Sequence, residues 1–163
     1  MTNKFKSRTS WREKLEKKHP SHGKVVDIPP KMQKRFGTGT MLIPRPLDVD
    51  ALIRKVQKGK LVTVTQIREE LAKDAHTDSA CPMTTGIFIR IVAETAEEDL
   101  QIERKPITPY WRVIKADGSL NPKFPGSTEA QAAHLEKEGH TILPAKGKKP
   151  PKVKDFERYL QKL

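Results

Sequence analysis

The first part of the chain combines one helical pattern with a long polar stretch. Ser10 precedes Trp11 and Leu15 and, with Glu13 three residues later, fits a capping box that begins a short helix. After residue 20 prolines and glycines recur, and we predict an irregular extension that lies on the domain or on a ligand. The compact part is expected to begin near Pro44.

The middle of the chain predicts three helices and a strand. Asp48 is expected to cap the first helix and Thr65 the second, which follows a β-branched strand over residues 61–64. Pro82 suits the first turn of the third helix. Apolar residues three and four apart predict one buried face on each helix: Val49, Leu52, Ile53 and Val56; Ile67 and Leu71; and Met83, Ile87, Phe88, Ile91 and Val92. The last two helices, with a short polar link, form a helix-turn-helix candidate.

The pattern beyond residue 93 predicts one further core helix. Residues 94–98 and 103–105 form a polar stretch that is expected to lead from the third helix to a segment over residues 107–114. Thr128 and Gln131 are candidate caps of the last core helix, which buries Leu135 and ends at Gly139. A basic linker over residues 146–152 leads to a small amphipathic helix that we expect to pack back onto the domain through Phe156, Tyr159, Leu160 and Leu163.

Together these elements predict an α+β fold, mostly helical, with a winged-helix-like helix-turn-helix domain and basic extensions at both ends. The expected divisions are a basic N-terminal extension over residues 1–43, the domain over residues 44–143, and a basic linker with a short C-terminal helix over residues 144–163.

The charge of the chain indicates a class of partner. The sequence holds 32 lysines and arginines against 20 aspartates and glutamates, a formal net charge of +12. An excess of that size favours a polyanion, and nucleic acid is the commonest one. We favour a DNA contact for the basic N-terminal arm, although a solubilising tail has the same composition.

The remaining composition narrows the chemistry and the compartment. Cys81 is the only cysteine, so an intrachain disulfide and a thiolate zinc site are excluded. The five histidines have no metal-site spacing, and we expect neither a metal nor a cofactor. No secretory signal precedes the domain, and no apolar run approaches the roughly 20 residues that span a bilayer. We therefore expect a cytoplasmic protein, nucleoid-associated if bacterial, with no membrane partner.

Two segments together resemble the DNA-binding domain of the O6-alkylguanine-DNA alkyltransferases. Residues 59–67 (GKLVTVTQI) resemble the start of the helix-turn-helix of that family. Residues 109–114 (PYWRVI), followed by Asp117-Gly118 and residues 135–140 (LEKEGH), resemble its active-site loop and closing helix. The resemblance covers roughly residues 47–143 and rests on the order and spacing of these segments.

The resemblance also implies that the repair chemistry is lost. Repair members of the family carry Pro-Cys-His-Arg-Val in the loop, and the cysteine thiolate accepts the alkyl group. Here Tyr110 stands at the cysteine and Trp111 at the activating histidine, while Pro109 and Arg112 match. A phenol with a pKa of about 10 is a poor nucleophile beside a thiolate. We therefore expect that the protein is not an enzyme and has no catalytic residue.

The family has a branch without the cysteine, the alkyltransferase-like proteins, which bind alkylated DNA, flip the base and flag the lesion for nucleotide excision repair. The resemblance to this branch implies a lesion pocket of Pro109, Tyr110, Trp111 and Arg112, with double-stranded DNA and excision repair proteins as partners. An aromatic side chain in that pocket can pack on a flipped purine. The alternative is that Tyr110 and Trp111 are core aromatics beneath a loop.

The resemblance implies a set of DNA contacts as well. Arg90 matches the arginine that takes the place of the flipped base, and the expected contacts on the helix-turn-helix are Thr65, Thr84, Thr85 and Gly86. Two departures stand against this. Val64 occupies the place of a tyrosine that contacts the target phosphate, and the acidic residues over 94–99 would repel DNA if they faced it.

Three functions stay open on the sequence. The first is a non-enzymatic protein that recognises O6-alkylguanine-type damage. The second, favoured by Val64, is a general or regulatory nucleic-acid-binding module on the same fold without lesion specificity. The third is an enzyme that uses Cys81, which precedes Pro82 at a helix N-terminus where the macrodipole lowers a thiol pKa. The resemblance places Cys81 on the DNA-binding element, away from the alkyl pocket.

Overall fold

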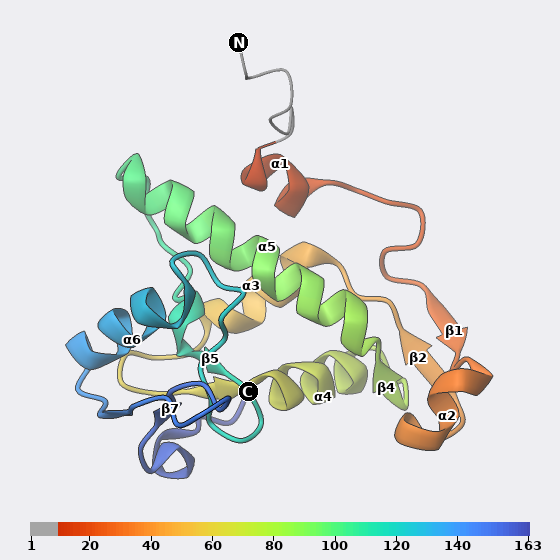
Figure 1. The fold of residues 1–163 in the computed structure, drawn as a ribbon. Helices are drawn as coiled ribbons and strands as arrows, with labels where there is room; N and C mark the ends of the chain where they lie inside the picture. Colours follow the sequence, from red (N-terminus) through yellow and green to blue (C-terminus); the bar gives the residue numbers. More distant parts are fainter. Residues whose placement is uncertain (1–9) are drawn as a thin grey trace.

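The computed structural model describes residues 10–163 (Figure 1), and the basic residues of the predicted arm over 1–9 lie outside the described part. Its helices are α1 (Trp11–Glu16), α2 (Pro30–Phe36), α3 (Pro46–Arg54), α4 (Val64–Asp74), α5 (Pro82–Gln101) and α6 (Ser127–Lys137), with 3₁₀ helices at Tyr110–Arg112 and Phe156–Tyr159. Its strands are β1 (Val25–Asp27), β2 (Thr40–Leu42), β3 (Val62–Thr63), β4 (Ser79–Ala80), β5 (Val113–Ile114), β6 (Ile142–Leu143) and β7 (Lys152–Val153). The α+β composition is confirmed, and its winged-helix part stays a prediction.

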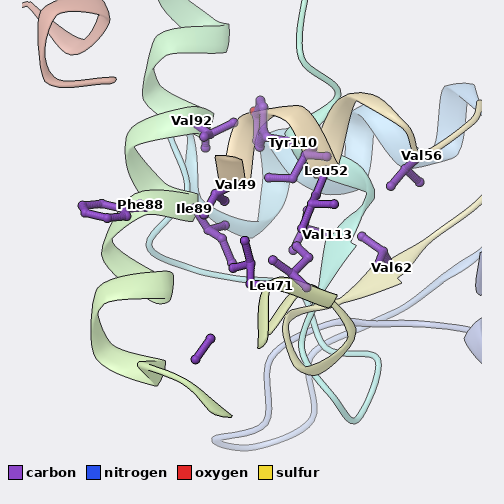
Figure 2. Packing of buried hydrophobic residues seen from close by; sticks show 14 of the residues in the cluster. Val49, Leu52, Val56, Val62, Leu71, Phe88, Ile89, Val92, Tyr110 and Val113 are labelled. Atoms are coloured by element: carbon purple, nitrogen blue, oxygen red, sulfur yellow. The ribbon is translucent and has the colours of Figure 1, made fainter. Parts of the chain in front are cut away.

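The long helix α5 organises the fold (Figure 1), because both α1 and α3 pack along it. The main core lies between α3, α4 and α5, where the expected residues of α3 and α4 are buried (Figure 2). Val49 and Ile67 are both fully shielded from solvent. A second, smaller cluster centred on Leu61 and Leu135 joins α6 to the C-terminal segment.

The segment after residue 20 is ordered, in contrast to the irregular extension that the sequence predicted. β1 pairs antiparallel with β2, and β2 pairs parallel with β4, so that Leu42 lies opposite Ala80. Ile28 is only 1% exposed and Leu42 belongs to the main buried cluster, so this part of the chain contributes to the core. Strands of two or three residues carry too little periodicity to predict, and they form here because a partner strand lies beside them.

Two predicted helix starts are corrected by the structure. α4 is capped by Thr63 and not by Thr65, since the Thr63 hydroxyl accepts from the Gln66 backbone N–H and the Gln66 side chain bonds back to Thr63. α3 begins at Pro46, so Asp48 lies in its first turn. Proline is favoured as the first helical residue because its fixed φ is already helical.

The predicted buried face of α5 is also corrected. The helix continues through the acidic stretch to Gln101 and buries a stripe that includes Phe88, Ile89 and Val92. Met83 and Ile87, which the sequence placed in the core, are 73% and 53% exposed. The spacing of apolar residues on this helix allows two overlapping stripes, and packing of α1 and α3 selects the one that contains Ile89.

The C-terminal segment packs back onto the domain, as expected. The Leu61 backbone N–H donates to the Tyr159 carbonyl at 2.9 Å, and the Gln161 N–H donates to the Leu61 carbonyl at 2.8 Å. α6 follows Gly126 and has no side-chain cap, so neither Thr128 nor Gln131 is the cap that the sequence predicted. Instead the buried Gln131 amide donates to the carbonyls of Trp111 and Val113 and ties α6 to β5.

His140 makes the stability of this closing segment depend on pH. It is 6% exposed, and neither ring nitrogen has a hydrogen-bond partner among the described residues. Burial lowers the pKa of the imidazole below its ordinary 6.5, and Glu138 opposes this only in part. The folded state disfavours the protonated ring. The stability that the neutral His140 contributes is therefore fully present above pH 6.5, and it is lost as the pH falls below that value.

We therefore expect the wild-type protein to lose more unfolding free energy than His140→Leu when the pH is lowered from 8 to 5. Urea unfolding of both proteins at the two pH values measures the difference, and the other titrating groups cancel in the comparison. Equal losses in the two proteins would show that His140 is accommodated equally well when charged.

Candidate nucleic-acid interface

One face of α5 is open to solvent near its N-terminal end. Met83, Gly86, Ile87 and Arg90 are exposed and follow one another at helical spacing, on the side opposite the core. A Cβ atom built on Gly86 would meet nothing within 4 Å, so the backbone here is free to approach a ligand closely. The Arg90 side chain is 52% exposed and has Glu94 at 3.8 Å and the Trp11 ring at 5.8 Å.

Two lysines from a separate loop stand beside this face. The segment between β5 and α6 brings Lys115 and Lys123 to a hollow of about 440 Å³, which is also lined by Pro82, Met83, Gly86, Ile87, Arg90, Asn121 and Pro122. No acidic side chain lines this hollow. Its three charged groups are therefore all cationic, which fits a polyanion.

Three of the four acidic side chains of α5 have partners within the protein. Asp99 is 4% exposed and forms an ion pair with Arg12 of α1. Glu97 accepts from the Tyr110 hydroxyl at 2.6 Å and lies 3.2 Å from His134. Glu94 pairs with Arg90. Internal pairing of these carboxylates reduces the repulsion that an acidic stretch on the helix would exert on phosphates.

Tyr110, predicted to line a lesion pocket, lies in the core. It has no exposed surface and belongs to the same packed cluster as Leu52 and Val92 (Figure 2). Its ring meets Trp111 and Phe124 edge to face, with ring centroids 5.4 and 5.3 Å apart. In this conformation a base cannot stack on Tyr110, so a lesion pocket at this position requires the side chain to move.

The surroundings of Tyr110 also make its phenol a poor nucleophile. Burial raises the pKa of the phenol well above its ordinary value, and the hydrogen bond to Glu97 raises it further. His134, which lies between Glu97 and the Trp111 ring, stacks on that ring with centroids 4.2 Å apart. Burial and Glu97 thus keep the phenol neutral, and the packed rings of Trp111 and His134 hold it in place, which opposes alkyl transfer to it.

The other two loop residues are held by Glu138. Arg112 donates from Nε and Nη2 to both Glu138 oxygens, at 2.7 to 3.1 Å, and from Nη1 to the Val56 carbonyl at 2.6 Å. Trp111 Nε1 donates to Glu138 at 2.8 Å. Burial opposes ionisation of Glu138, but the hydrogen bonds from Arg112 and Trp111 outweigh it and lower the pKa of the carboxyl. Of the predicted pocket residues, Trp111 and Arg112 thus meet at Glu138, whereas Tyr110 and Pro109 are buried away from it.

The predicted threonine contacts are placed in different settings. Thr85 has no exposed surface, and its hydroxyl donates to the Cys81 carbonyl at 2.7 Å. The Thr84 hydroxyl, which is partly buried, bonds to the Cys81 sulfur at 3.2 Å. Thr65 is exposed in the first turn of α4 but does not line the hollow, and Val64 packs against the core. Among the predicted DNA contacts, the structure brings Gly86 and Arg90 together at the hollow.

The two lysines of the hollow and the partners of Tyr110 were not predicted from the sequence. Lys115 and Lys123 follow a strand and a turn, and nothing in their local pattern links them to α5. Glu97 was assigned to a connection. The helical spacing of the apolar residues continues through Val92, Ala93 and Ala96 and could have shown that the helix extends past Glu97. Glu97 then lies one residue beyond the buried stripe.

Other kinds of site find little support in the described part of the chain. Within residues 10–163 no group of three or more metal-ligating side chains is close enough to hold an ion. None of the described helices is both long and apolar enough to cross a bilayer. Cys81 is partly buried and lies before α5, on the helix-turn-helix candidate and apart from Tyr110.

Comparison with known proteins identifies the fold. No protein-family model matches the chain, and no curated protein matches it. Among solved structures, Atl1 of S. pombe, crystallised with damaged DNA that contains O6-carboxymethylguanine, is similar with a TM-score of 0.50 and 18% sequence identity. The match covers 72% of this chain and 94% of the Atl1 chain. The protein therefore has the fold of the alkyltransferase-like proteins.

Proposed function

We propose that the protein binds double-stranded DNA through the exposed face of α5 and recognises O6-alkylguanine-type damage without removing the alkyl group. The observation that carries the proposal is the hollow with three cationic side chains, Arg90, Lys115 and Lys123, beside the open backbone of Gly86. Cations at such a surface contact phosphates and position a duplex. Once the lesion is recognised, the bound protein would recruit excision repair proteins as its partners.

The non-enzymatic part of the proposal is supported by the surroundings of Tyr110. A phenol that is buried, hydrogen-bonded to a carboxylate and raised in pKa has no thiolate-like reactivity. Cys81 is the other candidate acceptor. Its sulfur accepts a hydrogen bond from Thr84 at the start of α5, outside the loop that resembles the active site.

A second function has its own support. Complete burial of Tyr110 and packing of Val64 against the core both favour a DNA-binding module that has kept the fold without the lesion pocket. Both proposals use the same face of α5. They differ only in whether the affinity depends on the alkylated base.

Binding to a short fluorescent duplex with one O6-methylguanine, against the unmodified duplex, separates the two functions. If the protein is a damage sensor, fluorescence anisotropy will give tighter binding to the modified duplex, and the methyl group will stay on the DNA. Equal affinities would establish the general module. No binding to either duplex at low salt would overturn both proposals.

Two lysine variants locate the interface in the same assay. Lys123→Ala should weaken binding to both duplexes and lower the slope of log affinity against log salt by about one, because one phosphate contact is lost. Lys137→Ala, an equally simple change on the exposed side of α6, should leave both unchanged. If the two variants changed the affinity equally, the hollow would not be the DNA-binding surface.

A further inference from the structure

We infer that Met83 and Ile87 enter the base stack of the bound duplex, as an apolar wedge at the start of α5. The inference rests on the proposed DNA binding and assigns to these two side chains a role that the resemblance would give to Arg90. Its basis is the position of two large, exposed apolar groups at a hollow whose charged lining residues are all cationic.

The exposure of this pair has no explanation within the fold. Met83 is 73% and Ile87 53% exposed, and they lie four residues apart, so they form one apolar ridge along the helix. Neither belongs to a hydrophobic cluster of the described residues. Leaving two such side chains in water forfeits the stabilisation that burial would bring, and adjacent exposed apolar groups mark interaction sites.

The surroundings of the ridge select DNA as the group that covers it. Arg90, Lys115 and Lys123 line the same hollow, and no acidic residue does. An apolar protein partner would not require three cations around it, whereas a duplex presents phosphates on both sides of its base edges. Methionine and isoleucine are among the side chains that minor-groove proteins insert between base steps.

Arg90 is less suited to entering the stack. It lies one turn farther along α5, with Glu94 at 3.8 Å and the Trp11 ring at 5.8 Å. Moving its charged head between bases would separate it from both neighbours and strip its water. A contact from Arg90 to a phosphate requires no such separation and no such loss of water. We therefore assign the base stack to Met83 and Ile87 and the DNA backbone to Arg90.

The test is the fluorescence of 2-aminopurine, which rises when this base is unstacked, in a short duplex that carries it next to O6-methylguanine and in the same duplex with guanine. The variants are Met83→Gln with Ile87→Gln, Arg90→Ala, and Ile102→Gln as the matched control. Ile102 is 68% exposed beyond the far end of α5. Glutamine is a good helix former, and thermal melting checks that each variant folds.

We expect the wild-type protein to raise the fluorescence at saturation and the double variant to lose this rise, with at least about tenfold weaker binding. Arg90→Ala should bind more weakly yet give the full rise once saturated, and Ile102→Gln should match the wild type. The inference is overturned if the wild type binds without a rise, or if the rise survives in the double variant or disappears in Arg90→Ala. Absence of any binding would instead refute the proposed function.

Discussion

Replacing Arg112 with alanine should destabilise the protein by about 3–5 kcal/mol, because the change leaves a buried carboxylate without its partner. The Arg112 and Glu138 side chains are 13% and 7% exposed. Arg112 donates to both Glu138 oxygens and to the Val56 carbonyl, so one side chain joins the loop after α3, the 3₁₀ helix and the end of α6. Without it, Glu138 keeps only its bonds from Trp111 and Gly59.

Urea unfolding of Arg112→Ala, Arg112→Lys and Arg90→Ala measures this effect. Lysine keeps the charge but cannot reproduce the fork that reaches two acceptors, so it should recover only part of the loss. Arg90→Ala is the matched control, since the Arg90–Glu94 pair lies at the surface and should change the stability by less than about 1 kcal/mol. If Arg112→Ala also lost less than about 1 kcal/mol, the bonds between Arg112 and Glu138 would not be a main source of stability.

Replacing Tyr110 with alanine should have an effect of similar size, about 3–5 kcal/mol, because it empties a fully buried aromatic site. Tyr110→Phe keeps the ring contacts with Trp111 and Phe124 and loses only the hydrogen bond to Glu97. Since Glu97 is partly exposed, that change should destabilise the protein by about 1 kcal/mol. Thermal or urea unfolding of both variants gives the comparison.

The same two variants decide the role of Tyr110 in binding. If Tyr110 serves the core alone, Tyr110→Phe will bind modified and unmodified duplexes as the wild type does. If the tyrosine moves out to meet an alkylated base, a measured preference for the modified duplex should shrink in Tyr110→Ala at a temperature where that variant is still folded. A Tyr110→Ala variant as stable as the wild type would show that the ring is not part of the core.

The arrangement around Tyr110 is unlike a site that activates a nucleophile. The position that resembles the acceptor cysteine carries a ring that fills the core, and the residue after it stacks on His134. Glu138, in the segment that resembles the closing helix of the family, is occupied by Arg112 and Trp111. In this structure Trp111, His134 and Glu138 thus act as structural partners of one another and of the loop.

The candidate interface was predictable only in part. Gly86 and Arg90 were predicted as contacts from the resemblance, and the structure brings both to the hollow. Thr85 was predicted with them and is buried. The lysines of the hollow were missed because Lys115 and Lys123 are far from α5 in sequence and meet it only through the packing of the β5–α6 segment. The roles of all these residues in binding stay predictions.

Features that depend on a few neighbouring residues could be predicted from the sequence. Ser10 caps α1, Pro82 begins α5, and Gly118 adopts the positive φ that the predicted turn requires. Such features are local because a cap or a turn is satisfied by bonds within four or five residues. Core positions with a single possible helical face, such as Ile67 and Leu71 on α4, were predictable for the same reason.

Two features depend on tertiary packing and could not be predicted from the sequence: which face of α5 is buried, and which short strands form. Met83 and Ile87 are as apolar as Ile89 and Val92, so the helical spacing could not rank the two stripes. α1 and α3 cover one of them, and the other is left beside Lys115 and Lys123. β1 to β4 are likewise too short to be stable without partners from distant parts of the chain. Burial and pairing are properties of the assembled surfaces, and a local pattern contains only one side of each contact.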